Sequence, residues 1–204
     1  MMLIVLLVLG LSASVEPNAN YGCYGDLRSI DTPVITCGNV ADTSNCGGTA
    51  IERVAQIDIV RVRRYEVQIR NVARNLCVEP ALIAAMICRE SRVGHLLVNG
   101  WNSGRSRYGL MQIHSHYYPI IGAWNSEEHI SQATTILITQ IRALRKRFPH
   151  WTWQQYWRGG ICAYQAGITD ILSYPGTDFC GTYRRFADEV IFTARYYSNS
   201  LFLE

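Results

Sequence analysis

The sequence predicts a mainly α-helical protein with a single globular domain. Its 204 residues are 49% hydrophobic, which suffices for one core and is short for two domains. Apolar residues recur at three- and four-residue spacing in several long stretches, as in helices that bury one face. A glycine-rich segment, 94–126, separates the helical stretches and leaves room for a small hairpin.

The amino-terminal segment, MMLIVLLVLGLSAS, contains no charged side chain and ends in small residues. It is too short to span a bilayer and resembles the core of a secretory signal peptide. We therefore expect a signal peptide over residues 1–14, cleaved near 14–19, and a secreted domain over 20–204. No other stretch reaches transmembrane length, so no membrane span is expected.

Seven cysteines also favour secretion, and none forms the paired CxxC spacing of a zinc site. Disulfides are the better interpretation, and the odd number leaves at least one thiol over. Residues 20–49 are rich in Gly, Thr, Asn and Cys, with little periodicity. We expect a disulfide-stapled N-terminal loop there, packed on the helical body. The cysteines are Cys23, Cys37, Cys46, Cys77, Cys88, Cys162 and Cys180.

Helical periodicity begins at Ala50 and continues to Leu76. Pro80 suits the first turn of a further helix, because its missing N–H would have no partner there. That helix, about 80–91, is apolar on all sides up to Arg89, which predicts a central buried helix.

Beyond it, segment 94–126 predicts a loop with a small hairpin lining a cleft. Helical periodicity returns over 130–148, where Pro149 closes the helix. Two more helices are expected near 153–166 and 183–197.

Glu90 stands at the end of the buried helix, on the stripe of Ile83 and Ile87. Burial and the negative end of the helix dipole both disfavour the ionised carboxylate, so both raise its pKa. A carboxylic acid that is protonated near neutral pH is what a general acid for glycosidic cleavage requires. The alternative is a structural Glu90 paired with Arg89 or Arg92.

Three motifs follow one another in order: ESR at 90–92, YGLMQI at 108–113 and RGGICAYQAG at 158–167. With these motifs the chain resembles goose-type lysozymes and, more distantly, lytic transglycosylases. The resemblance runs from about Gly22 to Tyr197. It implies an α+β lysozyme-like fold and an enzyme that cleaves the β-1,4 bond between N-acetylmuramic acid and N-acetylglucosamine in peptidoglycan.

By this resemblance, Glu90 is the catalytic acid, and Gln112 and Tyr164 contact the sugar or the acid. The family's two disulfides fall on Cys23 with Cys77 and on Cys37 with Cys46. Two cysteines stand where the family has serines, Cys88 and Cys162. We expect Cys162 to pair with Cys180, which leaves Cys88 as a buried free thiol.

The chain also departs from the family in its cleft. Ser103 and His114 stand where members place two aspartates thought to hold or activate the attacking water. Gln165 replaces the usual Asn after Tyr164, and we place Ser103 and Gln165 among the substrate-binding residues. Between Glu90 and Glu127 the chain has no Asp or Glu.

Three mechanisms remain open. In a hydrolase, Glu90 is the acid and His114 is a substitute base, because the unperturbed pKa of histidine, about 6.5, suits that role. The alternative for His114 is that it and His116 are ordinary histidines of a polar loop. A lytic transglycosylase would need Glu90 alone, with the 6-hydroxyl of the sugar as nucleophile. A pseudoenzyme would only bind peptidoglycan or another glycan or protein.

The remaining expectations concern partners. The net charge of +3 is mild and no motif indicates nucleic acid. His114 and His116 lack a third ligand, so no metal is expected, and no cofactor is expected either. The expected partner is bacterial peptidoglycan or a chitooligosaccharide, bound by a monomer.

Overall fold

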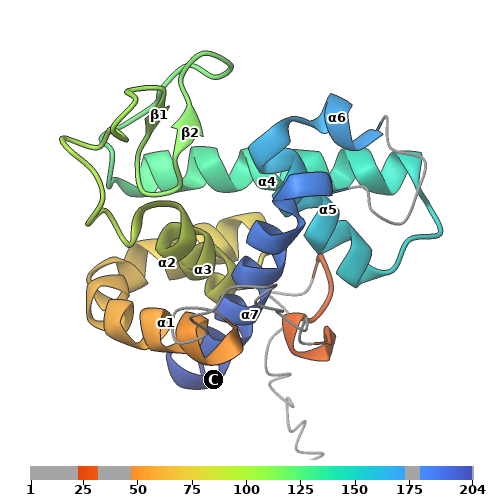
Figure 1. The fold of residues 1–204 in the computed structure, drawn as a ribbon, viewed down its shortest axis with the longest axis horizontal. Coiled ribbons are helices and arrows are strands. Elements are labelled where there is room, and N and C mark those ends of the chain that lie inside the picture. Colours follow the sequence, from red (N-terminus) through yellow and green to blue (C-terminus); the bar gives the residue numbers. More distant parts are fainter. Residues whose placement is uncertain (1–22, 32–46, 173–179, 204) are drawn as a thin grey trace, which may run out of the picture.

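The computed structural model describes residues 23–31, 47–172 and 180–203, and the side chains of Arg28 and Leu172 are left aside. The expected signal peptide over 1–14 and the expected disulfide between Cys37 and Cys46 lie outside these residues. Most of the described chain is helical, with one two-stranded sheet, which confirms the predicted fold class (Figure 1).

Seven α-helices and three short 3₁₀ helices make up the described helical part. In chain order they are η1 Leu27–Ser29, α1 Gly48–Val62, η3 Arg63–Tyr65, α2 Glu66–Leu76, α3 Pro80–Ser91, α4 Glu127–Arg147, α5 Trp153–Ala166, α6 Ile168–Leu172, η4 Gly181–Tyr183 and α7 Arg184–Ser200. The helical pattern from Ala50 to Leu76 thus forms two helices joined by a 3₁₀ turn. The helix predicted over 80–91 is confirmed, and α6 was not predicted.

Helix α3 is the central element of the core. Every residue from Pro80 to Cys88 is buried, and α3 packs against α1, α2 and α7. It ends where Arg92 adopts a left-handed conformation, with φ 52°, and donates its backbone N–H to the Cys88 carbonyl. The predicted central buried helix is therefore confirmed, and Glu90 lies in its last turn.

The hairpin between α3 and α4 consists of strands β1 Arg107–Tyr108 and β2 Ile113–His114, which pair antiparallel. Figure 1 shows the hairpin and α6 on the same side of α4, toward its two ends. Helix α5 packs against α4, α6 and α7. It begins at a capping box, in which Thr152 and Gln155 satisfy each other's backbone N–H groups.

Two disulfides are described. Cys23–Cys77 ties the amino-terminal part to the end of α2, and Cys162–Cys180 joins α5 to the segment before η4. Both were expected, and Cys88 is the buried free thiol that the sequence predicted.

Candidate active site

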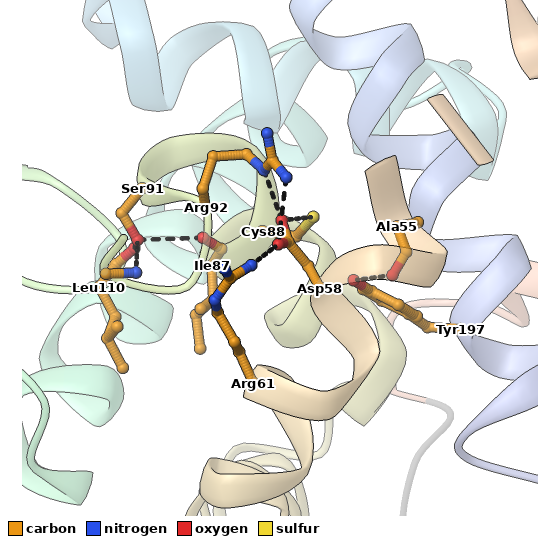
Figure 2. A network of polar contacts seen from close by, with 10 residues as sticks. Ala55, Asp58, Arg61, Ile87, Cys88, Ser91, Arg92, Leu110 and Tyr197 are labelled. Carbon is orange, nitrogen blue, oxygen red and sulfur yellow. Dashed lines mark hydrogen bonds and ion pairs between the residues drawn. The ribbon is translucent and has the colours of Figure 1, made fainter. Parts of the chain in front are cut away.

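The last turn of α3 is held by an ionic network around the buried Asp58 of α1 (Figure 2). The Asp58 side chain is completely buried, and its carboxylate accepts hydrogen bonds from Arg92 at 2.5 and 3.2 Å. Arg61 donates to it at 2.6 Å, and the Cys88 Sγ lies 3.5 Å away. Because burial raises the pKa of Cys88 to about 11, its thiol stays protonated as a donor. The network therefore holds Cys88 and Arg92, which lie two residues before and two residues after Glu90.

Ser91 joins the same turn of α3 to the hairpin. Its hydroxyl lies 2.8 Å from the carbonyl oxygen of Leu110, to which it donates, and 3.1 Å from that of Ile87. The Ser91 Oγ in turn accepts the backbone N–H of Gly94 at 2.9 Å. Since Leu110 belongs to the YGLMQI motif, this contact sets the position of that motif relative to Glu90.

Glu90 is half-buried and accepts a hydrogen bond from the side-chain amide of Gln165 on α5. Burial raises its pKa to about 8, although Arg107, the Gln165 hydrogen bond and Arg89 each lower it. Desolvation is thus the dominant effect, and the raised pKa has the direction expected from the sequence. The carboxyl group is mostly protonated at neutral pH.

The two arginines that flank Glu90 have other partners. Arg89 forms a salt bridge with Glu189 of α7, and Arg92 binds Asp58. A structural Glu90 would be expected to pair with one of them. The geometry instead leaves Glu90 with Gln165 as its hydrogen-bond partner.

The hairpin turn carries the second motif and is sharply constrained. Gly109 has φ +82°, and a Cβ there would come within 1.8 Å of the His129 ring, so glycine is required. Gln112 is buried, takes a left-handed φ of 55° and donates to the Gly109 carbonyl at 2.7 Å. A non-glycine residue with positive φ is a local strain that often marks a functional position.

A pocket of about 450 Å³ lies between the hairpin, α4, α5 and α6. The hydroxyl of Tyr164 on α5 donates to the Met111 carbonyl at 2.8 Å, which links α5 to the hairpin turn. Burial, and next the nearby Glu90, raise the pKa of Tyr164 well above its ordinary value, so it stays a neutral donor. The polar residues that line the pocket include Arg107, Gln112, His114, Tyr164, Gln165 and Asp170.

The structure brings most of the predicted site residues together. Gln112, His114, Tyr164 and Gln165 line the pocket. Glu90 is not among the lining residues, but its carboxyl accepts a hydrogen bond from one of them, Gln165. The Ser103 side chain is exposed in the loop before β1 and is not among the pocket-lining residues.

His114 stands at the end of β2, partly exposed. Desolvation, Arg107 and His116 lower its pKa, in that order, so the imidazole is neutral at neutral pH. Its ring lies 4.6 Å from that of Tyr117. A neutral imidazole that faces the pocket is in the protonation state that a base needs.

Two pocket residues were missed by the sequence interpretation, Arg107 and Asp170. Arg107 donates to the backbone carbonyls of Gln112 and Gln165, at 3.5 and 3.3 Å. Asp170 is an exposed carboxylate on α6. Arg107 directly precedes the YGLMQI motif and Asp170 closely follows RGGICAYQAG, and this proximity was the only signal that could have indicated them.

Comparison with known proteins gives a consistent result. The family model described as Lysozyme g matches residues 24–200. The chain is 39% identical to Lysozyme g of Struthio camelus, over 95% of this chain and 97% of that protein. It is 38% identical to Lysozyme g of Gallus gallus, over 96% and 94%. It is also 37% identical to Lysozyme g-like protein 2 of Homo sapiens, over 92% and 86%.

Proposed function

Because the chain belongs to the lysozyme g family, we propose that it is a glycoside hydrolase that cleaves the β-1,4 bond between N-acetylmuramic acid and N-acetylglucosamine in peptidoglycan. The observation that carries the proposal is the half-buried carboxyl of Glu90, which is hydrogen-bonded to the pocket residue Gln165 and has a pKa of about 8. At pH 7 such a group is mostly protonated, and it can donate its proton to the departing sugar oxygen.

The second half of the reaction needs a group that activates water. In an inverting enzyme this base lies across the sugar from the acid. His114 lines the pocket as a neutral imidazole, and we propose it as the base. Asp170 is the competing candidate, since it is the carboxylate among the described pocket residues.

A lytic transglycosylase would dispense with this base, because the 6-hydroxyl of the sugar attacks and one carboxyl serves as acid and then as base. Ser103 is exposed and stands where the family has an aspartate, so this position supplies no carboxylate to activate water. This absence of a base at Ser103 supports the transglycosylase alternative. The products separate the two reactions: hydrolysis leaves a reducing end, and transglycosylation leaves a 1,6-anhydro end.

The deciding experiment is the clearing of a suspension of peptidoglycan-rich bacterial walls by the purified protein and by a Glu90→Gln variant. We expect clearing by the wild type and a loss of at least about 100-fold in the variant. Equal clearing by both would exclude Glu90 as the acid. No clearing by either, with glycan binding retained, would indicate a pseudoenzyme.

The proposed setting is extracellular, with the protein acting as a monomer on bacterial walls. In the described part of the chain, no helix has the length and hydrophobicity needed to cross a membrane. The described disulfides fit an oxidising compartment.

A further inference from the structure

Arg107 places a guanidinium group in the wall of the pocket. The guanidinium of the half-buried Arg107 contacts two backbone carbonyl oxygens, of Gln112 and Gln165, at the long end of hydrogen-bond distances. It forms no salt bridge within the described residues. Guanidinium has five N–H donors in a planar fork, so donors remain for a ligand in the pocket.

Within the described residues, no acidic group forms a salt bridge with Arg107. Glu90, whose pKa Arg107 lowers, still keeps its proton to about pH 8. Asp170 also lines the pocket, but it is exposed on α6 and forms no salt bridge with Arg107. His114 adds no negative charge. As far as the structure describes the chain, the pocket therefore presents a guanidinium without an ion-pair partner, close enough to Glu90 to lower its pKa.

We propose that Arg107 forms a subsite for a carboxylate carried by the sugar itself, namely the lactyl carboxylate of N-acetylmuramic acid in peptide-free glycan strands. The proposal rests on the proposed function for its substrate class. N-Acetylmuramic acid carries this carboxylate and N-acetylglucosamine lacks it. A guanidinium fork matches a planar carboxylate with two parallel hydrogen bonds, which gives geometric selectivity as well as attraction.

The subsite would also support the proposed acid. The positive charge of Arg107 is the largest of the effects that lower the pKa of Glu90. A carboxylate bound against the guanidinium offsets that effect, so Glu90 holds its proton more firmly when an anionic sugar is bound than when a neutral one is.

A purely structural Arg107 makes a different prediction. Its contacts with the Gln112 and Gln165 carbonyls join the hairpin to the end of α5. If these contacts were its whole role, replacing Arg107 would disturb the pocket and weaken neutral and anionic glycans alike. The ratio of the two affinities therefore distinguishes a carboxylate subsite from a scaffold.

The test is calorimetric binding in the Glu90→Gln background, which prevents cleavage. Three tetrasaccharides serve as probes. The first alternates N-acetylglucosamine with N-acetylmuramic acid and carries free lactyl carboxylates. The second is the same compound with its lactyl groups as neutral methylamides, and the third is chitotetraose, which has no lactyl group. The variants are Arg107→Gln, Arg107→Lys and, as a matched control, Arg105→Gln. Arg105 is exposed two residues away, and it does not line the pocket.

With Arg107 present, we expect the free acid to bind about 10- to 100-fold more tightly than its methylamide, the effect of a charge-assisted hydrogen-bond pair. In Arg107→Gln the two compounds should bind with about equal affinity. Arg107→Lys should retain part of the preference for the free acid, and Arg105→Gln should retain all of it. An unchanged ratio in Arg107→Gln, or an equal loss for all three probes, would overturn the subsite.

The binding and clearing experiments can refute the proposed subsite and the proposed hydrolase activity independently of each other. A carboxylate preference in a protein that clears no walls would contradict the proposed hydrolase and keep the subsite. Efficient clearing without any preference for the free acid would contradict the subsite alone. A fourth probe, the tetrasaccharide with stem peptides, tests the lactyl assignment itself, because its lactyl group is an amide. If this were the only probe whose binding depended on Arg107, the lactyl assignment would be wrong.

Discussion

The side-chain amide of Gln165 donates a hydrogen bond to the carboxyl of Glu90, across 75 residues of sequence. This bond connects the end of α3 to the end of α5 and reaches the pocket wall. It also favours the ionised form of Glu90, against the larger effect of burial. Gln165 is thus a residue that tunes the proposed acid as well as a pocket-lining one.

The first prediction concerns the pH dependence of activity. An acid with a pKa of about 8 must be protonated to act, so kcat/KM should fall as the pH rises through about 8. Gln165→Ala removes a donor that stabilises the carboxylate, so the pKa of Glu90 rises further. The alkaline limb should then move to higher pH, in a kcat/KM profile with a soluble glycan. A shift to lower pH would contradict this role.

The second prediction separates the two candidate bases. If His114 activates water, His114→Ala should lower the rate of hydrolysis by about 100-fold or more, and the acidic limb of the pH profile should disappear. Asp170→Asn is the matched comparison, because Asp170 lines the same pocket. An unchanged rate in His114→Ala with a large loss in Asp170→Asn would transfer the role to Asp170.

The third prediction concerns the network under Glu90. Asp58→Asn removes the buried carboxylate shared by Arg61 and Arg92, and the free energy of unfolding should fall by about 3 kcal/mol. Glu66→Gln is the control, because it breaks a more exposed pair with Arg70 and should change stability by less than about 1 kcal/mol. Urea unfolding of both variants measures the difference, and equal losses would rule out a special contribution from Asp58.

The fourth prediction links the acid to stability. The folded chain keeps the proton of Glu90 to about pH 8, whereas the ordinary pKa is 4.5. Between these values the unfolded state releases the proton first, so the stability of the wild type falls as the pH rises. Glu90→Gln cannot ionise.

The stability of Glu90→Gln relative to wild type should therefore increase from pH 4 to pH 9. Because Glu90 is only half-buried, we expect an increase on the order of 1–3 kcal/mol. Denaturant unfolding at both pH values checks it. A relative stability that does not depend on pH would mean that the fold does not hold the proton.

The central helix could be predicted because its signals are local. Pro80 suits a first turn, and the residues after it are apolar without interruption, as expected of a helix buried on all sides. The pKa direction of Glu90 followed from the same stripe. Helix α6 could not be predicted, since its five residues are too few to show a period.

The partners of the charged residues could not be predicted, because they come from distant parts of the chain. The sequence suggested Arg89 and Arg92 as neighbours that could pair with Glu90, but α7 and α1 supply Glu189 and Asp58 to them instead. Likewise Arg107 and Asp170 reach the pocket only because the hairpin and α6 both stand against α4 and α5.

The most direct test of the central claim is the titration of the Glu90 carboxyl itself. Infrared difference spectra between the wild type and Glu90→Gln isolate the C=O stretch of the protonated acid. We predict that this band persists through pH 7 and disappears with a midpoint near pH 8. A midpoint near the ordinary value of 4.5 would show an ionised carboxylate at neutral pH and contradict the role of Glu90 as a general acid.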